Sequence, residues 1–339
     1  MTEPGARPTA VGTDADAVID AIVQQAFPGA SLTRRPFAYA MSSRLEEIAV
    51  CRAGHPPLRL VAKHLGRDAK IEAAQLAKPA ALHSAGRELD VYRHILAAAD
   101  LGTPKLVGGW AGADDDGVIV IERVEGTPLS EIGDFSVWEA TARWLARMHA
   151  RFAYAPQRIS ASAPGARGAL VSYDRELLAA RGRRGLQRAS EQALGPAEMI
   201  VALGARHEYA LRALSSAPPT LVHGDFYPSN IVVTEERIAV VDWELAGIGP
   251  AVLDLAALAA GGWDHEQRHD LISAYHDEAR GAGPVETLTA LTRRTDLASL
   301  HLALHWVGSP PEWEAPDEHR RDWFGDALAA LDRLNGNRP

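Results

Sequence analysis

The stretch "LVHGDFYPSNIVV", residues 221–233, places an acid and an amide beside an apolar strand. Asp225 stands five residues before Asn230, and a second acid, Asp242, follows in "VVDWE". Polar side chains next to a buried strand cost free energy unless they have partners. Carboxylate and amide oxygens suit a hard cation such as Mg²⁺, and a carboxylate can also accept a proton from a reacting group. These residue types therefore indicate a metal-dependent active site.

The segment "NIVVTEERIAVVD" predicts the element that positions two of these side chains. Two β-branched runs flank "TEE", which is typical of an antiparallel hairpin with its turn near Glu235 and Glu236. Asn230 and Asp242 are equally spaced about residue 236, so we expect them to face each other, or nearly so, at the open end. Opposed side chains lie roughly 5 Å apart at Cβ, which allows both to hold one Mg²⁺ ion. Asp225, at the end of the preceding strand, can approach the same point.

A lysine and a glutamate in the first third of the chain form a second candidate group. Lys63, in "LVAKHL", lies among the apolar residues of an expected strand, and Glu88 shares the apolar face of an expected helix. Each would be costly to bury alone and is tolerable as a pair. Two alternatives stay open: both charges are solvated at element edges, or Glu72 is the partner of Lys63.

The surrounding pattern predicts an α+β protein with two lobes and a cleft between them. A strand-rich first third precedes a helix-rich remainder, with the seam near residues 125–128. We expect a flexible N-terminus at 1–14, an N-terminal lobe at 15–124 and a C-terminal lobe at 125–339. The expected elements are helices at 14–26, 86–99 and 138–152, strands within 44–65 and at 117–124, a loop at 156–170, and then mostly helices apart from strands near 221 and 231–242.

Composition excludes several classes of protein. The formal net charge of −9 over 339 residues argues against nucleic-acid binding and is compatible with a neutral or cationic small substrate. No apolar run is long enough to span a membrane, and the single cysteine, Cys51, cannot form an internal disulfide. The N-terminus lacks the pattern of a signal peptide. We expect a cytoplasmic monomer or homodimer.

The motif "HGDFYPSN" matches the kinase catalytic-loop pattern His-x-Asp, four residues, Asn, and "VDWE" stands where protein kinases have Asp-Phe-Gly. Together these motifs resemble the aminoglycoside phosphotransferase family, which is similar in fold to protein kinases and related to choline and homoserine kinases. The resemblance implies a two-lobed, protein-kinase-like fold and transfer of the γ-phosphate of ATP, or of GTP, to a hydroxyl of a small molecule.

The resemblance also implies a role for each residue of the catalytic end. Asp225 would be the catalytic base, and Asn230 and Asp242 would hold Mg²⁺. His223 would brace the loop through hydrogen bonds. Asp254, in "GPAVLDLAAL", matches an aspartate that braces this loop in the family, or it is simply the N-cap of the next helix.

At the nucleotide end, Lys63 would contact the α- and β-phosphates and Glu88 would hold Lys63 in place. The backbone at Glu122 and Val124 would bind adenine. The phosphate-covering stretch, "FAYAMSSRLEE", has no glycine, and Ser42 and Ser43 occupy its tip.

Two departures from protein kinases favour a small-molecule acceptor. Gly224 replaces the arginine that reads a phosphorylated activation loop, and no Ala-Pro-Glu follows Asp242. Two alternatives are an inactive nucleotide-binding or regulatory protein of the same fold and, less favoured, a protein kinase.

Three further features have ordinary structural interpretations. His301 and His305 have the i, i+4 spacing of zinc ligands but lack a third ligand, so we expect packed helix histidines. The basic run "RGRRGLQR", 181–188, is interpreted as a solvated helix face. The C-terminal tryptophans would be core residues, or some would line the acceptor pocket; they are Trp263, Trp306, Trp313 and Trp323.

Overall fold

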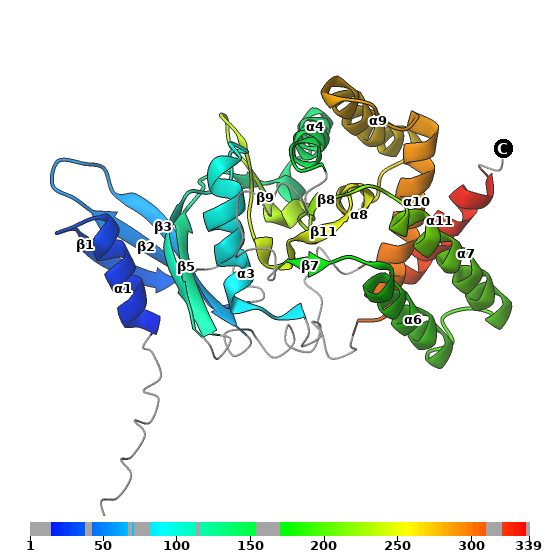
Figure 1. Ribbon diagram of the computed structural model, residues 1–339, viewed down its shortest axis with the longest axis horizontal. Helices are drawn as coiled ribbons and strands as arrows, with labels where there is room; N and C mark the ends of the chain where they lie inside the picture. The colour runs from blue at the N-terminus through cyan, green and yellow to red at the C-terminus, as the bar shows by residue number, and fades with distance from the viewer. Residues whose placement is uncertain are drawn as a thin grey trace, which may run out of the picture.

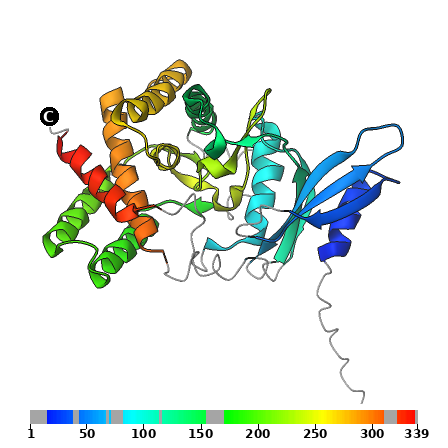
Figure 2. The same cartoon turned by 180° about the vertical axis from the view of Figure 1, so that it is seen from behind.

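The computed structural model describes residues 15–37, 43–66, 70, 82–112, 116–153, 170–309 and 321–336. Ser42, Glu72 and Trp313 lie outside these residues, as do most of the expected loop at 156–170 and the expected flexible segment at 1–14. The molecule is elongated, with a strand-rich part at one end and a helical part at the other (Figure 1), and the view from behind shows the same division (Figure 2). The predicted α+β class is confirmed.

The strand-rich part is one antiparallel sheet of five strands in the order β1-β2-β3-β5-β4. Its strands are β1 (Ser31–Pro36), β2 (Leu45–Cys51), β3 (Leu58–Gly66), β4 (Leu106–Ala111) and β5 (Asp116–Glu122). Sequence patterns predicted β2, β3 and β5 but not the outer strands β1 and β4. Cys51, at the end of β2, is exposed, although its apolar neighbours in the sequence favour a small core residue.

The two faces of this sheet follow from the alternation of side chains along β3 and β5. Leu60 and Ala62 are buried in one apolar cluster with Ile19 and Val23 of helix α1 (Ala15–Ala26). Lys63 is the next residue along β3, so its side chain points to the opposite face. That face is covered by helix α3 (Ala85–Asp90), which carries Glu88.

The expected helix at 86–99 is present but not uniform. After α3 it continues as a π-helix, η2 (Val91–Ile95), and then as a 3₁₀ turn, η3 (Leu96–Ala98). Tyr92 and Ile95 are buried in the central core as expected. π-Turns of this kind occur within α-helices and are frequent at functional sites.

The helical part is organised around α10 (Leu288–Val307), which packs against every other long helix of this part except α4. The other helices are α4 (Phe135–Arg151), α6 (Arg175–Glu191), α7 (Ala197–Ser215), α8 (Val252–Leu258), α9 (His265–Ala282) and α11 (Trp323–Gly336). None of the helices in the described ranges has both the length and the apolar character needed to cross a bilayer.

Two small sheets lie between the five-stranded sheet and the helices. One has the order β10-β9-β6 and the other β7-β11-β8. Their strands are β6 (Thr127–Pro128), β7 (Val171–Ser172), β8 (Pro219–Val222), β9 (Ile231–Val233), β10 (Ile238–Val240) and β11 (Gly247–Pro250), with 3₁₀ turns η4 (Leu129–Glu131), η6 (Pro228–Asn230) and η7 (Trp243–Leu245). Because β6 pairs with β9, the chain passes from one part to the other just after β5. The exact lobe boundary at residue 124 stays a prediction.

Candidate active site

The predicted hairpin is present as β9 and β10, in a register one residue away from direct opposition of Asn230 and Asp242. Ile231 pairs with Val240, and the amide of Val241 donates to the carbonyl of Asn230 at 2.9 Å. Asn230 is therefore opposite Val241, one position from Asp242, so Asn230 and Asp242 are nearly but not directly opposed, as the prediction allowed. The turn spans four residues, 234–237, and the hydroxyl of Thr234 accepts from two amides within it, a side-chain contact that β-branched patterning does not reveal.

Asp242 follows immediately and turns the chain sharply. Its backbone is left-handed, with φ 62° and ψ 61°, a conformation that aspartate tolerates better than most residues other than glycine. The turn leads into η7, and Asp242 is only partly exposed, at 24 % of its side chain.

Asp225 and Asn230 are joined directly. The Asn230 side-chain nitrogen, Nδ2, donates to the backbone carbonyl of Asp225 at 2.9 Å and to its carboxylate oxygen Oδ2 at 3.2 Å. Both bonds use the side-chain nitrogen of Asn230. Its side-chain oxygen, Oδ1, is therefore the atom that would meet a metal ion. The expected convergence of these two side chains is present.

The loop that carries Asp225 is fixed from below by a buried carboxylate. Asp254, 1 % exposed on α8, accepts from the backbone amides of His223 at 2.7 Å and Gly224 at 2.9 Å. The same carboxylate contacts His149 of α4 at 3.3 Å. Asp254 lies inside the first turn of α8 rather than at its cap, so the bracing interpretation holds and the N-cap alternative does not.

His223 acts as a second brace, as expected. Its Nε2 donates to the carbonyl of Val241 at 2.9 Å, and its Nδ1 accepts from the amide of Asp225 at 3.3 Å. Its ring is fully buried and packs edge-on against Trp243. The histidine therefore ties the Asp225 loop to the strand that leads to Asp242.

Lys63 lies at the centre of the second group. Its ammonium is 2.7 Å from Glu88 Oε2 and 2.7 Å from Asp242 Oδ1. Glu88 is 2 % exposed, and its other oxygen accepts from the amide of Trp243 at 3.2 Å. The buried pair is therefore Lys63 with Glu88, and the alternative of solvated charges is wrong.

The two acids control the charge of Lys63. Burial of the ammonium acts to lower its pKa, but Asp242 and Glu88 outweigh burial and raise the pKa of Lys63 above the ordinary lysine value. The lysine is therefore charged at neutral pH.

A second lysine, which the sequence did not single out, lies at the same place. Lys70 contacts Glu244 of the "VDWE" motif at 2.5 Å, and Glu244 lies 3.8 Å from Lys63. The backbone of Lys70 also pairs with that of Ser43, which is buried, in an isolated antiparallel β-bridge. A narrow cavity of about 20 Å³ is lined by these residues, namely Ser43, Lys63, Lys70 and Glu244. Of the expected phosphate loop, Ser43 thus lies beside Lys63, whereas Ser42 is outside the described residues.

Glu122 and Val124 lie where the chain leaves the sheet. The Glu122 carboxylate accepts from Arg237 at 2.6 Å, which ties the end of β5 to the turn between β9 and β10. Within the described ranges, the amide of Val124 donates to no backbone carbonyl.

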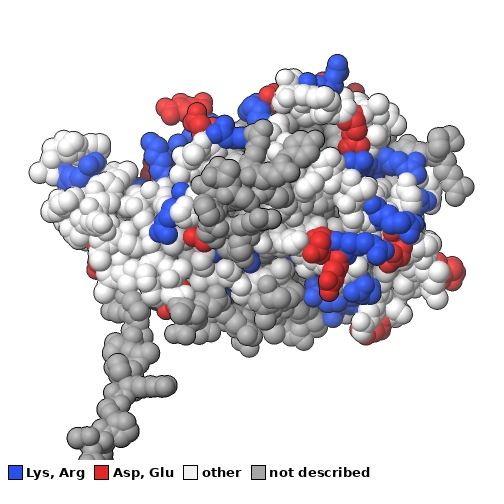
Figure 3. All heavy atoms as spheres, in the orientation of Figure 1, with Lys and Arg blue, Asp and Glu red and all other residues white. Residues whose placement is uncertain are grey.

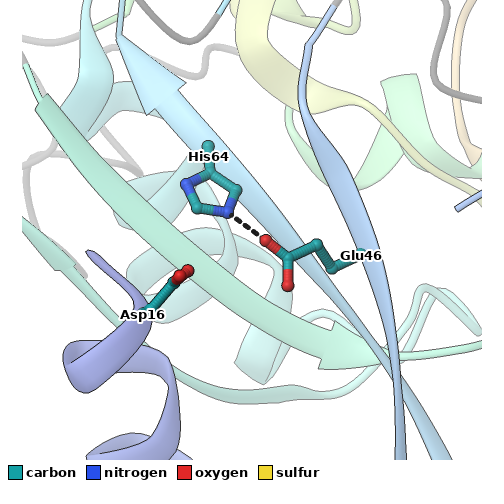
Figure 4. A group of neighbouring side chains, drawn as sticks. All are labelled: Asp16, Glu46 and His64. Atoms are coloured by element: carbon teal, nitrogen blue, oxygen red, sulfur yellow. Dashed lines mark hydrogen bonds and ion pairs between the residues drawn. The ribbon is translucent and has the colours of Figure 1, made fainter. Parts of the chain in front are cut away.

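Another group of metal-ligand type is present in the sheet. Ligand atoms of Asp16, Glu46 and His64 all lie within 4.8 Å of one another (Figure 4). The Arg34 guanidinium, however, is 2.7 Å from Asp16 and 2.6 Å from Glu46, and Arg44 is 2.8 Å from Glu46. These cations already neutralise the carboxylates, so the group is an ion-pair network that holds α1 on the sheet.

The other candidates from the sequence have structural partners. His301 bonds to His207 at 3.1 Å with stacked rings, and no described group of three metal ligands contains it or His305. Trp263 packs edge-on against Trp138, whereas Trp306 donates to the hydroxyl of Tyr227, two residues after Asp225.

Fold and site together define a class of protein, a kinase-like enzyme with two parts and a catalytic loop between them. The sequence model of the phosphotransferase enzyme family matches residues 59–291, which include every described charged residue of the site. The chain belongs to this family, and the prediction of its enzyme class, a kinase of small molecules, is confirmed.

Individual relatives are consistent with this assignment. Viomycin phosphotransferase of Streptomyces vinaceus is 30% identical over 216 residues, which are 55% of this chain and 70% of that protein. The N-acetylmuramate/N-acetylglucosamine kinase of Neisseria meningitidis is 36% identical over 76 residues, 22% of this chain and 23% of that protein. A solved aminoglycoside 2'-phosphotransferase in complex with GDP has the same fold, with a TM-score of 0.58 and 15% identity over 95% of this chain and 97% of that one.

Proposed function

We propose that this protein transfers the γ-phosphoryl group of ATP, with GTP as the alternative donor, to a hydroxyl of a small molecule, with Asp225 as the base. The observation that carries the proposal is that two linked pairs of polar residues lie at the open end of the β9–β10 hairpin. Asp225 bonds to Asn230 on one side of the hairpin, and Asp242 contacts Lys63 on the other.

The donor set fits Mg²⁺. Asn230 offers an oxygen because its nitrogen is bonded to Asp225, and Asp242 is a partly exposed carboxylate. Both are hard oxygen ligands, and Mg²⁺ prefers a few such protein ligands together with phosphate oxygens. When bound, the ion would offset the negative charge of the phosphates.

The chain's own residues would perform the remaining tasks. Lys63 would bind the α- and β-phosphates, held in position by Glu88, while Ser42 and Ser43 would cover the phosphates. The backbone at Glu122 and Val124 would bind the adenine. These assignments rest on position and on the family pattern.

The reaction would be an in-line displacement. The acceptor oxygen forms a bond to the γ-phosphorus as the bond from that phosphorus to the β–γ bridging oxygen breaks, which releases ADP. The hydroxyl proton moves to the Asp225 carboxylate, whose orientation is fixed by Asn230 and by the loop that Asp254 braces. The relatives' acceptors, viomycin and N-acetylated amino sugars, define the kinds of hydroxyl compound to test first.

The proposal is tested by incubating the full chain with ATP or GTP labelled in the γ-phosphate and a panel of aminoglycosides, peptide antibiotics, amino sugars and amino alcohols. Transfer of label to at least one acceptor, abolished by EDTA and restored by Mg²⁺, is expected. Mg²⁺-dependent nucleotide binding with no transfer across the panel would instead favour an inactive binding protein.

A further inference from the structure

One arginine of the helical part is buried without an acidic partner. Arg181 of α6 is 7 % exposed, and its Nε is fully buried without a hydrogen bond. In the described part of the chain no carboxylate forms an ion pair with it. A buried, uncompensated charge is costly, so this side chain calls for an explanation.

The expectation that the basic run 181–188 forms a solvated face is therefore wrong at its first residue. Arg183 and Arg184 are exposed, whereas Arg181 points inward. On the surface, Lys and Arg gather over the helical end of one face with Asp and Glu between them (Figure 3). Arg181 differs from these residues by its burial and its lack of an acid.

Two glycines explain how α6 brings Arg181 inward. A Cβ at Gly182 would overlap the ring of His207 on α7, and one at Gly185 would overlap the carbonyl of Leu304 on α10. Without side chains at these positions, α6 lies directly against both helices. This close packing sets Arg181 of α6 against α10, the helix that carries His305, the residue after Leu304.

His305 has the same unusual property as Arg181. Its Nδ1 is buried and has no hydrogen-bond partner. Burial lowers the pKa of His305 well below the ordinary histidine value, and the nearby charge of Arg181 lowers it further. A neutral imidazole and a guanidinium, each with an unused polar atom, therefore lie on two helices, α10 and α6, that pack against each other.

This pair lies beside the catalytic loop. The guanidinium carbon of Arg181 is 5.4 Å from the centre of the Tyr173 ring, and the Tyr173 hydroxyl donates to the carbonyl of Leu245 at 2.8 Å. A Cβ on Gly224, next to Asp225, would overlap that hydroxyl. One aromatic ring thus separates Arg181 from the loop that carries the base.

The charges of Arg181 and Asp225 act on the same two side chains. Burial raises the pKa of Tyr173 to about 12, and it also raises the pKa of Tyr227. In both tyrosines Asp225 adds to this rise and Arg181 opposes it. Both charges are therefore within electrostatic reach of Tyr173 and Tyr227.

We propose that the acceptor of this enzyme is an oxyanion, a hydroxylated compound with a carboxylate or phosphate that binds Arg181 and His305 while its hydroxyl faces Asp225. The inference rests on the proposed function and narrows the acceptor to an anionic class. Guanidinium is the side chain best suited to bind such groups, because its donors match the paired oxygens. The acidic net charge of the whole chain does not oppose this, since recognition depends on the local groups.

The first test uses acceptors in matched pairs, each hydroxy acid with its primary amide and each sugar phosphate with its parent sugar. The wild type is expected to prefer one anionic member by at least about 100-fold in kcat/KM. Arg181→Met, which keeps most of the packing volume, is expected to remove this preference through KM for the acceptor while KM for ATP stays unchanged. Arg181→Lys should restore part of it, and Arg183→Met, an exposed arginine on the same helix, should behave as wild type. Equal use of anionic and neutral acceptors, unaltered by Arg181→Met, would overturn the inference.

The second test needs no acceptor. Crystals of the wild type and of Arg181→Met are soaked in sodium selenate, and the selenium is located by anomalous scattering. An ion at Arg181 and His305 in the wild type only is the expected result, and ions at other arginines with none at Arg181 would contradict the proposal. An ion at Arg181 in a chain without phosphoryl transfer would leave the anion site standing and remove the proposed function. Transfer to neutral acceptors only would leave the proposed function standing and remove the anion site.

Discussion

At the scale of single residues, the site is a balance of charge around Lys63. One ammonium lies 2.7 Å from two carboxylates, and Glu244 is a third at 3.8 Å. Glu88 is buried and Asp242 is partly exposed, so they have different tasks. Glu88 fixes the lysine, whereas in the proposed function Asp242 would exchange this contact for a metal ion.

Glu88→Gln tests the task of the buried acid. The amide keeps the shape of the side chain but removes its charge, so the Lys63 ammonium is held less firmly. We expect kcat/KM for ATP to fall by about 10- to 100-fold, as for other groups that orient a ligand-binding residue. Glu47→Gln, at a buried acid of β2 that contacts Arg123, is the control for general effects of losing a buried charge. Wild-type kinetics in Glu88→Gln would exclude this role.

At the scale of elements, the loop 223–225 takes its shape from neighbours distant in sequence. Asp254 accepts hydrogen bonds from two backbone amides of this loop, and the His223 ring donates one to the carbonyl of Val241. Gly224 has φ +80°. The positive φ and the Tyr173 hydroxyl next to it leave room for glycine only.

Gly224→Ala measures this constraint, with Gly54→Ala as the matched control. Gly54 also has a positive φ, of +75°, but nothing lies within 4 Å of a Cβ there. The control should lose about 1 kcal/mol of unfolding free energy through backbone strain alone. Gly224→Ala should lose about 2–5 kcal/mol because the overlap adds to the strain. Equal losses, measured by denaturant titration, would show that the contact with Tyr173 is unimportant.

The elements also show what the sequence could predict. Motif spacing predicted the loop 223–230 and the hairpin, because both are encoded by residue types at short range, whereas the Lys63–Glu88 pair was predicted from the apolar face of a helix and from the family resemblance. It missed β4, "LVGGWA", whose glycines are poor strand formers. They are present because a Cβ at Gly108 or Gly109 would lie 2.6 Å or 2.5 Å from side chains of α1 and α3. Such requirements come from packing between distant elements.

Two further differences have the same origin. The hairpin register is shifted by one residue because the Thr234 side chain holds a four-residue turn, a contact that alternation does not encode. Arg181 was assigned to a solvated face because basic runs usually are, and only the contacts of α6 with α7 and α10 place it inside.

At the scale of the whole molecule, the helical part depends on buried histidines between α7 and α10. His207 and His301 are each 2 % exposed and bond to each other. Burial lowers the pKa of His207 from 6.5 to about 4, and it lowers the pKa of His301 well below 6.5. Glu208 acts to raise the pKa of His207, whereas Arg183 lowers it further. The pKa of His301 is lowered further by Arg181.

Stability should therefore decrease as the pH falls below 6.5. The unfolded chain binds protons at these histidines in that range, whereas the folded chain does not bind one at His207 until about pH 4. His207 alone should remove about 2 kcal/mol of unfolding free energy between pH 7 and 5. The double variant His207→Gln, His301→Gln should show a smaller dependence, and His269→Gln, at an exposed position, an unchanged one. A dependence as steep in the double variant as in the wild type would contradict this assignment.

The central claim is that Asp225 accepts the proton of the acceptor hydroxyl, and the most direct measurement compares phosphoryl transfer by Asp225→Asn and by the wild type. Nucleotide affinity is measured in parallel by calorimetry in the presence of Mg²⁺. We predict that kcat falls by about 10²- to 10⁴-fold in Asp225→Asn while the affinity for ATP stays close to that of the wild type. A kcat for Asp225→Asn equal to that of the wild type would contradict the account.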